Sequence, residues 1–208
     1  VALGADIGAV AEAHHYVKEV VNGDLPFLLT SCCPAWSVMA KKTYPEYAGY
    51  ISMSLTPMVL TGRMIKKQHP DCKVVFIGPC AAKKLEASRR SVRSDIDFVL
   101  TFEEMAGVFD AKGIDFDKLE VEESLQTSSS LGKGFAASGG VAAAVVNAIH
   151  CIDPEMEVKT VKAEGLSECK KMLAMAKSGR YDGYLLEGMA CPGGCMGGAG
   201  VLADVRKA

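Results

Sequence analysis

Several features that would assign this chain to a special class of protein are missing from its 208 residues. No apolar run reaches the roughly 18 residues that a membrane-spanning helix requires, and the start does not resemble a secretory signal. The formal net charge is only −2, so there is no excess of one sign to attract nucleic acid or an anionic membrane. No internal repeat or low-complexity tract is present. We therefore expect a globular, cytoplasmic protein with neither a membrane span nor a nucleic-acid partner.

Short apolar strands alternate with helices along the chain. We predict strands over residues 26–30, 73–78, 97–100, 157–162 and 181–186, and helices over residues 6–21, 36–44, 56–67, 138–148 and 167–178. The first helix has an apolar face made of Ile7, Val10, His14, Val17 and Val21. The strand at 73–78 is expected to be buried, and Thr101 and Glu104 have the spacing of a capping box.

This alternation indicates an α/β fold with mainly parallel sheets. We expect a single domain, residues 1–208, with two lobes of mainly parallel sheet flanked by helices and the cofactor site in the cleft between them. The approximate lobes are residues 1–120 and 134–208, and a polar loop near 120–133 crosses from one to the other.

Cysteine is abundant, with eight in the chain. A small secreted domain would use them in disulfides, but a chain of this length can bury enough core to fold without them. A reducing compartment therefore favours metal or redox chemistry. Three cysteine sites each follow a predicted strand, and in open α/β sheets ligands gather beyond the carboxyl ends of the strands. The cysteines that could meet there as a four-thiolate site are Cys33, Cys80, Cys191 and Cys195.

The glycine-rich segment 186–200, with Cys191 and Cys195, is the most informative part of this pattern. Its glycines and proline rule out a stable helix, but they allow a tight turn that brings backbone N–H groups to a bulky group. Four thiolates suit either Zn²⁺ or an iron–sulfur cluster, and a structural zinc site usually has two closely spaced cysteine pairs where this chain has one. The remaining alternative is that a cysteine binds no metal and is a small buried core residue. We expect this of Cys72, Cys151 and Cys169.

Three segments resemble, in order, the three signature motifs of the iron-only (FeFe) hydrogenases. They are Thr-Ser-Cys-Cys-Pro-Ala-Trp at 30–36, Gly-Pro-Cys-Ala-Ala-Lys-Lys-Leu-Glu at 78–86 and Glu-Gly-Met-Ala-Cys-Pro-Gly-Gly-Cys at 187–195. The resemblance covers nearly the whole chain and is most similar to the clostridial branch called group B. It implies an H-cluster domain of an anaerobic bacterium that reversibly reduces protons to H2, without the accessory iron–sulfur domains that precede it in relatives.

The resemblance also implies which residues hold the cofactor. Cys33, Cys80, Cys191 and Cys195 would bind a 4Fe–4S cluster, and Cys195 would bridge to a two-iron unit that carries CO, cyanide and an azadithiolate. Lys83 would donate to a cyanide ligand, with Glu86 as its natural partner. Further contacts to the cofactor are expected from Pro57, Met189, Ser138 and Gly139.

Proton delivery is implied by the same resemblance. Cys32 would pass protons to the two-iron unit, and Glu12 and Ser52 would continue the relay toward solvent. His15 stands where family enzymes often carry another acid, a substitution that still allows proton transfer. Gly78 stands where better-known members have a methionine, which predicts a more open wall beside the two-iron unit.

Partners would be a ferredoxin-like electron donor or acceptor, or an accessory iron–sulfur domain, together with maturation proteins that deliver the two-iron unit. A non-catalytic relative remains an alternative, either an H2 or redox sensor or an iron–sulfur assembly protein. Such proteins keep the cluster cysteines but can lose the groups that serve the two-iron unit. A structural zinc protein is the third class.

Overall fold

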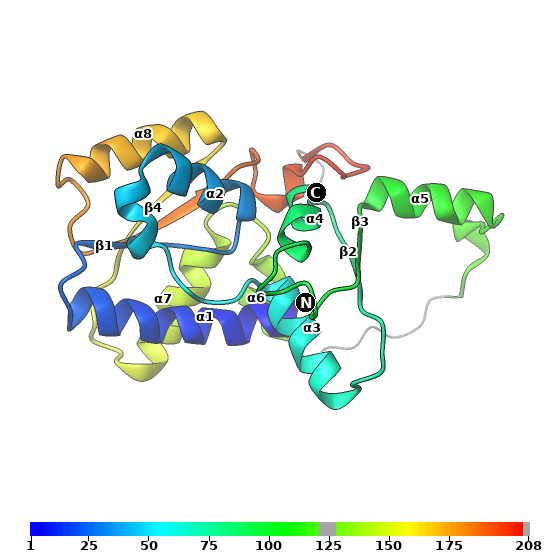
Figure 1. The fold of residues 1–208 in the computed structure, drawn as a ribbon, viewed down its shortest axis with the longest axis horizontal. Helices are drawn as coiled ribbons and strands as arrows, with labels where there is room; N and C mark the ends of the chain where they lie inside the picture. The colour runs from blue at the N-terminus through cyan, green and yellow to red at the C-terminus, as the bar shows by residue number, and fades with distance from the viewer. Residues whose placement is uncertain (121–127, 206–208) are drawn as a thin grey trace.

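The computed structural model describes residues 1–120 and 128–205, with one parallel sheet toward each end of an elongated molecule (Figure 1). The larger sheet has the order β1-β5-β4, formed by Phe27–Leu29, Tyr184–Met189 and Lys159–Glu164. The smaller sheet pairs β2 (Val75–Ile77) with β3 (Phe98–Leu100). The three pairings among these strands are all parallel, which confirms the predicted α/β class.

Helices flank both sheets. They are α1 (Ala2–Tyr16, continued by a π-helical turn at Val17–Val21), α2 (Pro34–Thr43), α3 (Pro57–Gln68), α4 (Ala82–Ala87), α5 (Phe102–Ala111), α6 (Ser130–Gly134), α7 (Gly140–Ile152) and α8 (Leu166–Lys177). Short 3-10 turns cover Pro45–Tyr50, Phe116–Lys118 and Cys195–Gly197. The capping box of Thr101 and Glu104 is confirmed at the start of α5. Within 1–120 and 128–205, no helix is both long and apolar enough to cross a bilayer.

The sheets do not follow the division expected near residues 120–133. β1, from the first part of the chain, pairs with β5 near its end, in the register Phe27 with Tyr184. Part of the expected crossing loop, residues 121–127, lies outside the described residues, and α6 begins within its last part.

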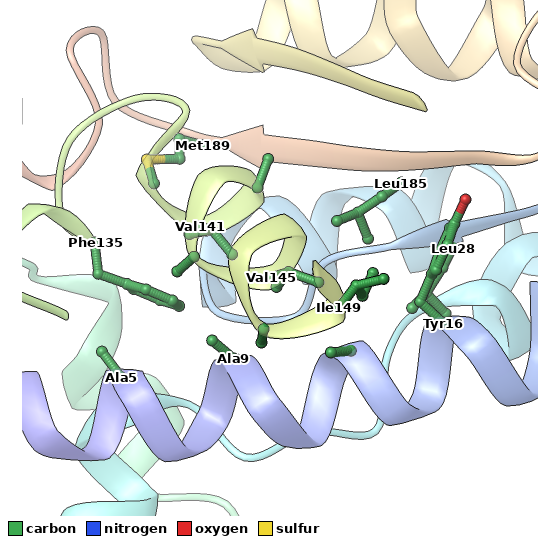
Figure 2. Packing of buried hydrophobic residues seen from close by; sticks show 14 residues of the cluster. Ala5, Ala9, Tyr16, Leu28, Phe135, Val141, Val145, Ile149, Leu185 and Met189 are labelled. Atoms are coloured by element: carbon green, nitrogen blue, oxygen red, sulfur yellow. The ribbon is translucent and has the colours of Figure 1, made fainter. Parts of the chain in front are cut away.

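The contact between α1 and α7 combines alanines of α1 with larger side chains of α7, among them Val145 and Ile149 (Figure 2). Ala9 and Ala13 are 3% and 0% exposed on the face of α1 that meets α7. The predicted apolar face is wrong, because Ile7, Val10 and Val21 are 38%, 46% and 46% exposed. Small side chains on α1 let α7 approach closely, and the larger apolar side chains of α1 are left outside this contact.

The two-stranded sheet is less buried than the sequence predicted. Val75 and Ile77 of β2 are 46% and 44% exposed, which corrects the expectation of a buried strand. A sheet of two strands covers little area, and the buried cluster beneath it is small, consisting of Met58, Val59, Val74, Val92 and Ile96.

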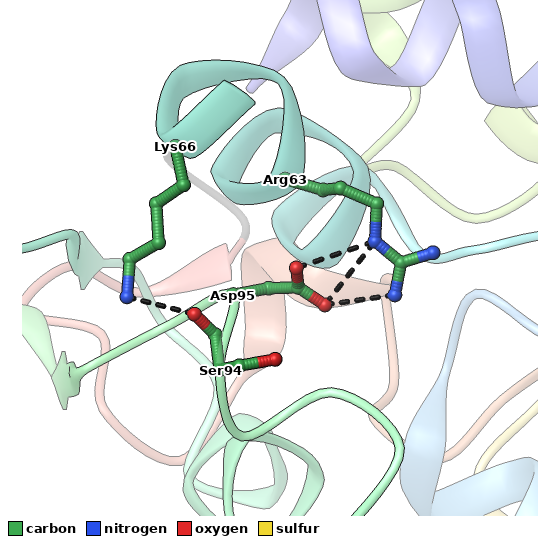
Figure 3. Close-up of polar contacts among 4 residues, drawn as sticks. All are labelled: Arg63, Lys66, Ser94 and Asp95. Atoms are coloured by element: carbon green, nitrogen blue, oxygen red, sulfur yellow. Dashed lines mark hydrogen bonds and ion pairs between the residues drawn. The ribbon is translucent and has the colours of Figure 1, made fainter. Parts of the chain in front are cut away.

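Polar contacts fasten α3 to the segment that leads into β3 (Figure 3). The Arg63 guanidinium donates to both carboxylate oxygens of Asp95, with Nη2 2.8 Å from Oδ2 and Nε 3.2 Å from Oδ1. Lys66 Nζ donates to the backbone oxygen of Ser94 at 2.8 Å. Two-point pairing of this kind fixes direction as well as distance. It therefore holds α3 against the segment that leads into β3.

Candidate functional site

The carboxyl ends of β1, β2 and β5 lead into three loops that meet between the two sheets. Cys33 ends the loop after β1 and is the N-cap residue of α2, while Cys80 follows β2. Cys191 and Cys195 lie on the loop after β5. The four side chains line one cavity of about 160 Å³, whose other walls are mostly alanine and glycine.

The first and third loops are held together by close packing. Trp36 is fully buried, and its indole nitrogen donates to the Thr30 carbonyl at 3.1 Å. Its ring lies against Gly188, where an added Cβ would collide with it. Cys33 Sγ accepts a hydrogen bond from the Ala190 N–H at 3.5 Å. A backbone donor aimed at a ligand sulfur is one means by which proteins tune iron–sulfur clusters.

The position of Cys195 depends on contacts with a turn that contains residues 136 and 137. The Cys195 N–H donates to the Ala136 carbonyl at 2.7 Å, and Ala137 forms a bridge with Gly194. Gly194 has φ +78°, and a Cβ there would lie 2.6 Å from the Ala136 oxygen. Glycine is required because two backbone segments touch at this point.

The cysteine donor set fits a cluster better than a single ion. Among residues 1–120 and 128–205, no three Cys, His, Asp or Glu side chains are grouped so that they could hold one metal ion. Zn²⁺ binds sulfur at about 2.3 Å and would need the thiols close together. Four thiols around a cavity of about 160 Å³ instead suit a polynuclear group such as 4Fe–4S.

Burial and mutual repulsion favour the protonated thiols of Cys80, Cys191 and Cys195 until a metal binds. Burial raises the pKa of Cys80, and it raises the pKa of Cys191, with Cys33 and Cys80 adding to the effect. The pKa of Cys195 is raised to about 12, first by burial and then by Cys80 and Cys33. A metal group must displace these protons, so its binding would be favoured at higher pH.

A second cavity of about 250 Å³ adjoins the first. Both cavities are lined by Cys33, Cys80, Met189 and Cys195. The second is lined in addition by Cys32, Lys83 and Pro57, with the apolar side chains of Met58, Phe76 and Phe135. Ser138 and Gly139 belong to neither wall and lie in the turn behind Cys195.

Lys83 is a buried cation in the wall of the second cavity. Its side chain is 9% exposed, and Nζ lies 2.7 Å from Glu86 Oε2, whose side chain is 6% exposed. Nζ also donates to the backbone oxygen of Cys32 at 3.3 Å. The predicted pairing with Glu86 is thus confirmed. Two of the three ammonium hydrogens are used in these contacts, and the charge remains beside the cavity.

The ring of Phe76 fills part of the space beside Gly78, where the sequence predicted a more open wall. A Cβ at Gly78 would lie 2.6 Å from Cζ of Phe76, so the phenylalanine ring occupies the place where a side chain at 78 would project. The ring also lines the second cavity. This neighbour cannot be inferred from residue 78 alone, because the phenylalanine ring beside it comes from two residues earlier, in β2.

Behind Cys32 lies a buried polar group made of Glu12 and Ser52. Both side chains are 3% exposed, and Glu12 Oε1 is buried without a hydrogen-bond partner. The pKa of Glu12 is raised to about 8, first by burial and then by the charge of Glu187, while the polar contact with Ser52 lowers it. Burial, then Glu12, raises the pKa of Cys32 well above its ordinary value.

Glu187 is a buried carboxylate to which the sequence reasoning gave no role. It is fully buried in β5, and its two oxygens accept the N–H groups of Gly139 and Ala142 at 2.6 and 2.7 Å. It therefore caps the N-terminus of α7 and fixes the turn at 136–139. A single acid within an otherwise apolar buried strand was the signal that could have revealed it.

Known proteins resemble this chain in both sequence and fold. Residues 1–199 match the family described as "Iron only hydrogenase large subunit, C-terminal domain". The chain is 30% identical to the Periplasmic [Fe] hydrogenase large subunit of Nitratidesulfovibrio vulgaris, over 98% of this chain and 59% of that protein. It is also 30% identical to the Cytosolic Fe-S cluster assembly factor NAR1 of Kluyveromyces lactis, over 66% of this chain and 31% of that protein.

The fold likeness extends over nearly the whole chain. A variant of the [FeFe]-hydrogenase HydA1 from Chlamydomonas reinhardtii superimposes with a TM-score of 0.77 at 22% identity, covering 97% of this chain and 69% of that one. Among the hydrogenases matched by sequence, the chain spans about half of the length, 42% of one and 59% of another. Its match to the family over residues 1–199 shows that the chain belongs to the iron-only hydrogenase large-subunit, C-terminal domain family.

Proposed function

We propose that this chain is the catalytic domain of an FeFe hydrogenase, which reversibly reduces protons to H2 at an H-cluster. One arrangement carries the proposal: the four-cysteine cavity adjoins a second cavity lined by Cys32 and Lys83, and Cys195 lines both. A protein that held only a 4Fe–4S cluster would need the first cavity alone. A thiol and a buried ammonium in the second wall suit an anionic metal unit beside the cluster.

The residues divide between the two parts of the cofactor. Cys33, Cys80, Cys191 and Cys195 would hold the 4Fe–4S cluster, and Cys195 would also bind a two-iron unit with CO, cyanide and azadithiolate ligands. When bound, this cofactor supplies the redox chemistry that interconverts protons, electrons and H2, while the protein supplies binding, orientation and protons.

The walls of the second cavity orient the cofactor and exclude water. The Lys83 ammonium would attract an anionic ligand such as cyanide, and Glu86 holds that ammonium in place. Pro57 and Met189 present apolar surface. Ser138 and Gly139 would act indirectly, because their turn supports the backbone of Cys195.

Protons would reach the second cavity through Cys32. Its thiol lines the cavity, and the acid behind it, Glu12, retains its proton at neutral pH because its pKa is about 8. Glu12 would return a proton to Cys32 after each transfer, and Ser52 would resupply Glu12. A thiol and a carboxylic acid can each donate and accept a proton, so the pair can relay protons toward the cavity.

Infrared spectroscopy on protein matured with the two-iron unit is the decisive experiment. CO and cyanide bands accompanied by H2 evolution support the proposal. A 4Fe–4S cluster that forms while the two-iron unit is never accepted contradicts it. Cys32→Ala should keep the bands and strongly reduce turnover, and unchanged turnover would remove Cys32 from the proton path.

A non-catalytic iron–sulfur role is the second candidate. The observation in its favour is the identity to NAR1, which equals the identity to the periplasmic hydrogenase subunit. A 4Fe–4S signal without two-iron uptake would select it, as an assembly protein or a sensor. Zinc without iron in a metal analysis would select a structural zinc site.

Electron transfer and maturation require partners. We propose a ferredoxin-like protein or an accessory iron–sulfur domain as the electron partner, and maturation proteins as the source of the two-iron unit. The names of the relatives include both a periplasmic and a cytosolic protein, so the cytoplasmic location stays a prediction.

A further inference from the structure

Lys162 and Glu187 lie side by side on β4 and β5, where they are partners in the register of the parallel sheet. Lys162 Nζ donates to the backbone oxygen of Ser138 at 3.1 Å. Glu187 Oε1 accepts the N–H of Gly139 at 2.6 Å. The oxygen of residue 138 and the N–H of residue 139 belong to the same peptide group. A cation and an anion from neighbouring strands therefore hold the two ends of one peptide, and we call this pair of side chains the peptide clamp.

The peptide clamp selects one orientation of the peptide between Ser138 and Gly139. In a trans peptide the C=O and the N–H point in opposite directions. Gly139 has φ +90°, and because glycine accepts both signs of φ, it does little by itself to prevent this peptide from rotating. A rotated peptide turns its oxygen toward the Glu187 carboxylate and its N–H toward the Lys162 ammonium. Both contacts are then repulsive, so the two side chains favour the observed orientation.

The two members of the clamp approach the peptide from different environments. Glu187 is fully buried, and its second oxygen accepts the N–H of Ala142 at 2.7 Å in the first turn of α7. Lys162 is exposed and lies over Gly139, where an added Cβ would be 3.1 Å from its Nζ. A glycine at this position lets the ammonium come close to the peptide. The exposed lysine can therefore be replaced with little risk to folding.

The held peptide lies against the loop that carries Cys195. An added Cβ at Gly194 would lie 2.7 Å from the backbone nitrogen of Ser138, so the two backbones touch at this point. In the same turn, the carbonyl of Ala136 accepts the N–H of Cys195 at 2.7 Å. Rotation of the peptide after Ser138 moves this turn and withdraws the acceptor from the Cys195 N–H. The orientation of one peptide is thus coupled to the backbone of a cysteine that lines both cavities.

We propose that Lys162 and Glu187 are positioning residues for Cys195, acting through the peptide between Ser138 and Gly139. Neither side chain is among the described residues that line the two cavities, so the clamp acts without touching the cofactor. It holds the backbone of Cys195 in place before a cluster binds and keeps the Cys195 N–H bonded to the turn. The inference deepens the proposed function and rests on it only in that Cys195 binds a 4Fe–4S cluster.

Breaking the clamp changes the surroundings of the cluster in a definite direction. A released Cys195 N–H and a looser loop bring a hydrogen-bond donor and water toward the cluster, and both stabilise its more negatively charged, reduced form. The reduction potential therefore becomes more positive whichever member of the clamp is lost. Charge alone gives a different pattern, because loss of the Lys162 cation lowers the potential and loss of the Glu187 anion raises it.

A redox titration of the 4Fe–4S protein, followed by electron paramagnetic resonance, tests the inference without the two-iron unit. Lys162→Met removes the ammonium and keeps an unbranched side chain, and it should shift the midpoint potential to a more positive value. The variant should also keep its iron only against about 10-fold less chelator, the lower end of the effect of an outer-shell partner. A shift to a more negative potential, or no shift, would overturn the inference.

Three further variants separate positioning from charge and from general stability. Lys162→Arg keeps both the charge and a donor, so it should restore the wild-type potential. Glu187→Asp keeps the charge but withdraws the carboxylate from Gly139, and it should shift the potential in the same direction as Lys162→Met. Lys159→Met removes an exposed lysine from the start of the same strand and should change neither measurement. If Glu187→Asp does not fold, the three lysine variants decide the question alone.

Amide hydrogen exchange, measured by nuclear magnetic resonance on the full chain before iron is added, distinguishes this inference from the proposed function. Lys162→Met should speed exchange of the Cys195 N–H about 5-fold, as expected for the loss of one hydrogen bond, and Lys159→Met should not. If wild type never binds a 4Fe–4S cluster, the proposed function fails while the exchange rates still decide the role of the clamp. If the cluster forms and Lys162→Met matches wild type in exchange and potential, the proposed function stands and the clamp does not position Cys195.

Discussion

Lys83 and Glu86 form an ion pair across one turn of α4, with Nζ 2.7 Å from Oε2 and both side chains less than a tenth exposed. Removing one partner leaves the other charge buried and uncompensated. Lys83→Ala should therefore lower the free energy of unfolding by about 3–5 kcal/mol, measured by chemical denaturation. Burying an ion pair costs desolvation free energy, and this cost is explained if the Lys83 charge is needed at the cavity wall.

Lys84, the adjacent lysine, provides the control for this loss of stability. Lys84 pairs with Glu104 at 2.6 Å, but both side chains are more than two-fifths exposed. Lys84→Ala should cost at most about 1 kcal/mol. Similar losses in the two variants would show that the Lys83 pair is solvated and that its charge does not act in a dry cavity.

Iron content should depend on four cysteines and not on a fifth. Cys33→Ser, Cys80→Ser, Cys191→Ser and Cys195→Ser should each reduce the bound iron and the cluster signal in electron paramagnetic resonance, since one of the four thiol ligands is lost. Cys151→Ser is the control, because Cys151 is exposed at the end of α7. A ligand variant that keeps full iron content would remove that cysteine from the site.

Glu12 should make the protein less stable as the pH rises. Its pKa is raised from 4.5 to about 8, mainly by burial, so between these values the folded state binds a proton that the unfolded state has released. Stability from this group is fully present below about pH 4.5 and is lost as the pH rises toward about 8. Glu12→Gln should flatten this part of the pH profile of the free energy of unfolding.

A control separates Glu12 from the general charge of the protein. Glu103→Gln removes an exposed glutamate from α5 and should leave the wild-type profile in place. If Glu12→Gln and wild type lose stability in parallel across that range, Glu12 is not the buried, protonated acid that the proposed relay requires.

The convergence of the cysteine loops could be predicted because it depends on local pattern and on one topological rule. Apolar strands end just before Cys32, Cys80 and Cys191, and parallel sheets bring such ends together. The capping box at Thr101 was likewise readable, since it involves residues three apart. These features require no knowledge of distant packing.

The rest depends on neighbours that the sequence does not identify. The buried residues of α1 are mostly alanine and glycine because α3 and α7 both approach it closely. The periodicity of the large apolar residues indicated the opposite face. Glu187 belongs to the third motif in the sequence, but its hydrogen-bond donors are backbone N–H groups some 45 residues earlier in the chain. The exposure of β2 follows from the width of its sheet, which no single strand reveals.

Phe76 and Gly78 should be energetically coupled, because the phenylalanine ring occupies the space beside the glycine. Gly78→Ala alone should destabilise the protein, since the new Cβ would meet the ring and force it to move. In the background of Phe76→Ala the same substitution should cost much less. A double-mutant cycle by chemical denaturation should give a coupling free energy within about 0.5–3 kcal/mol, the range for residues in contact.

Phe76 and Gly78 both line the second cavity, so the pair can also be tested by its effect on a bound cofactor. Phe76→Ala should open the wall and make matured protein lose its CO bands faster in air, and Phe76→Leu should retain part of the protection. Phe98 offers the control, because it lies on the neighbouring strand β3, is 61% exposed and is not part of the cavity wall. Equal rates of loss in Phe76→Ala and Phe98→Ala would mean that the ring fills space beside Gly78 without guarding the cavity.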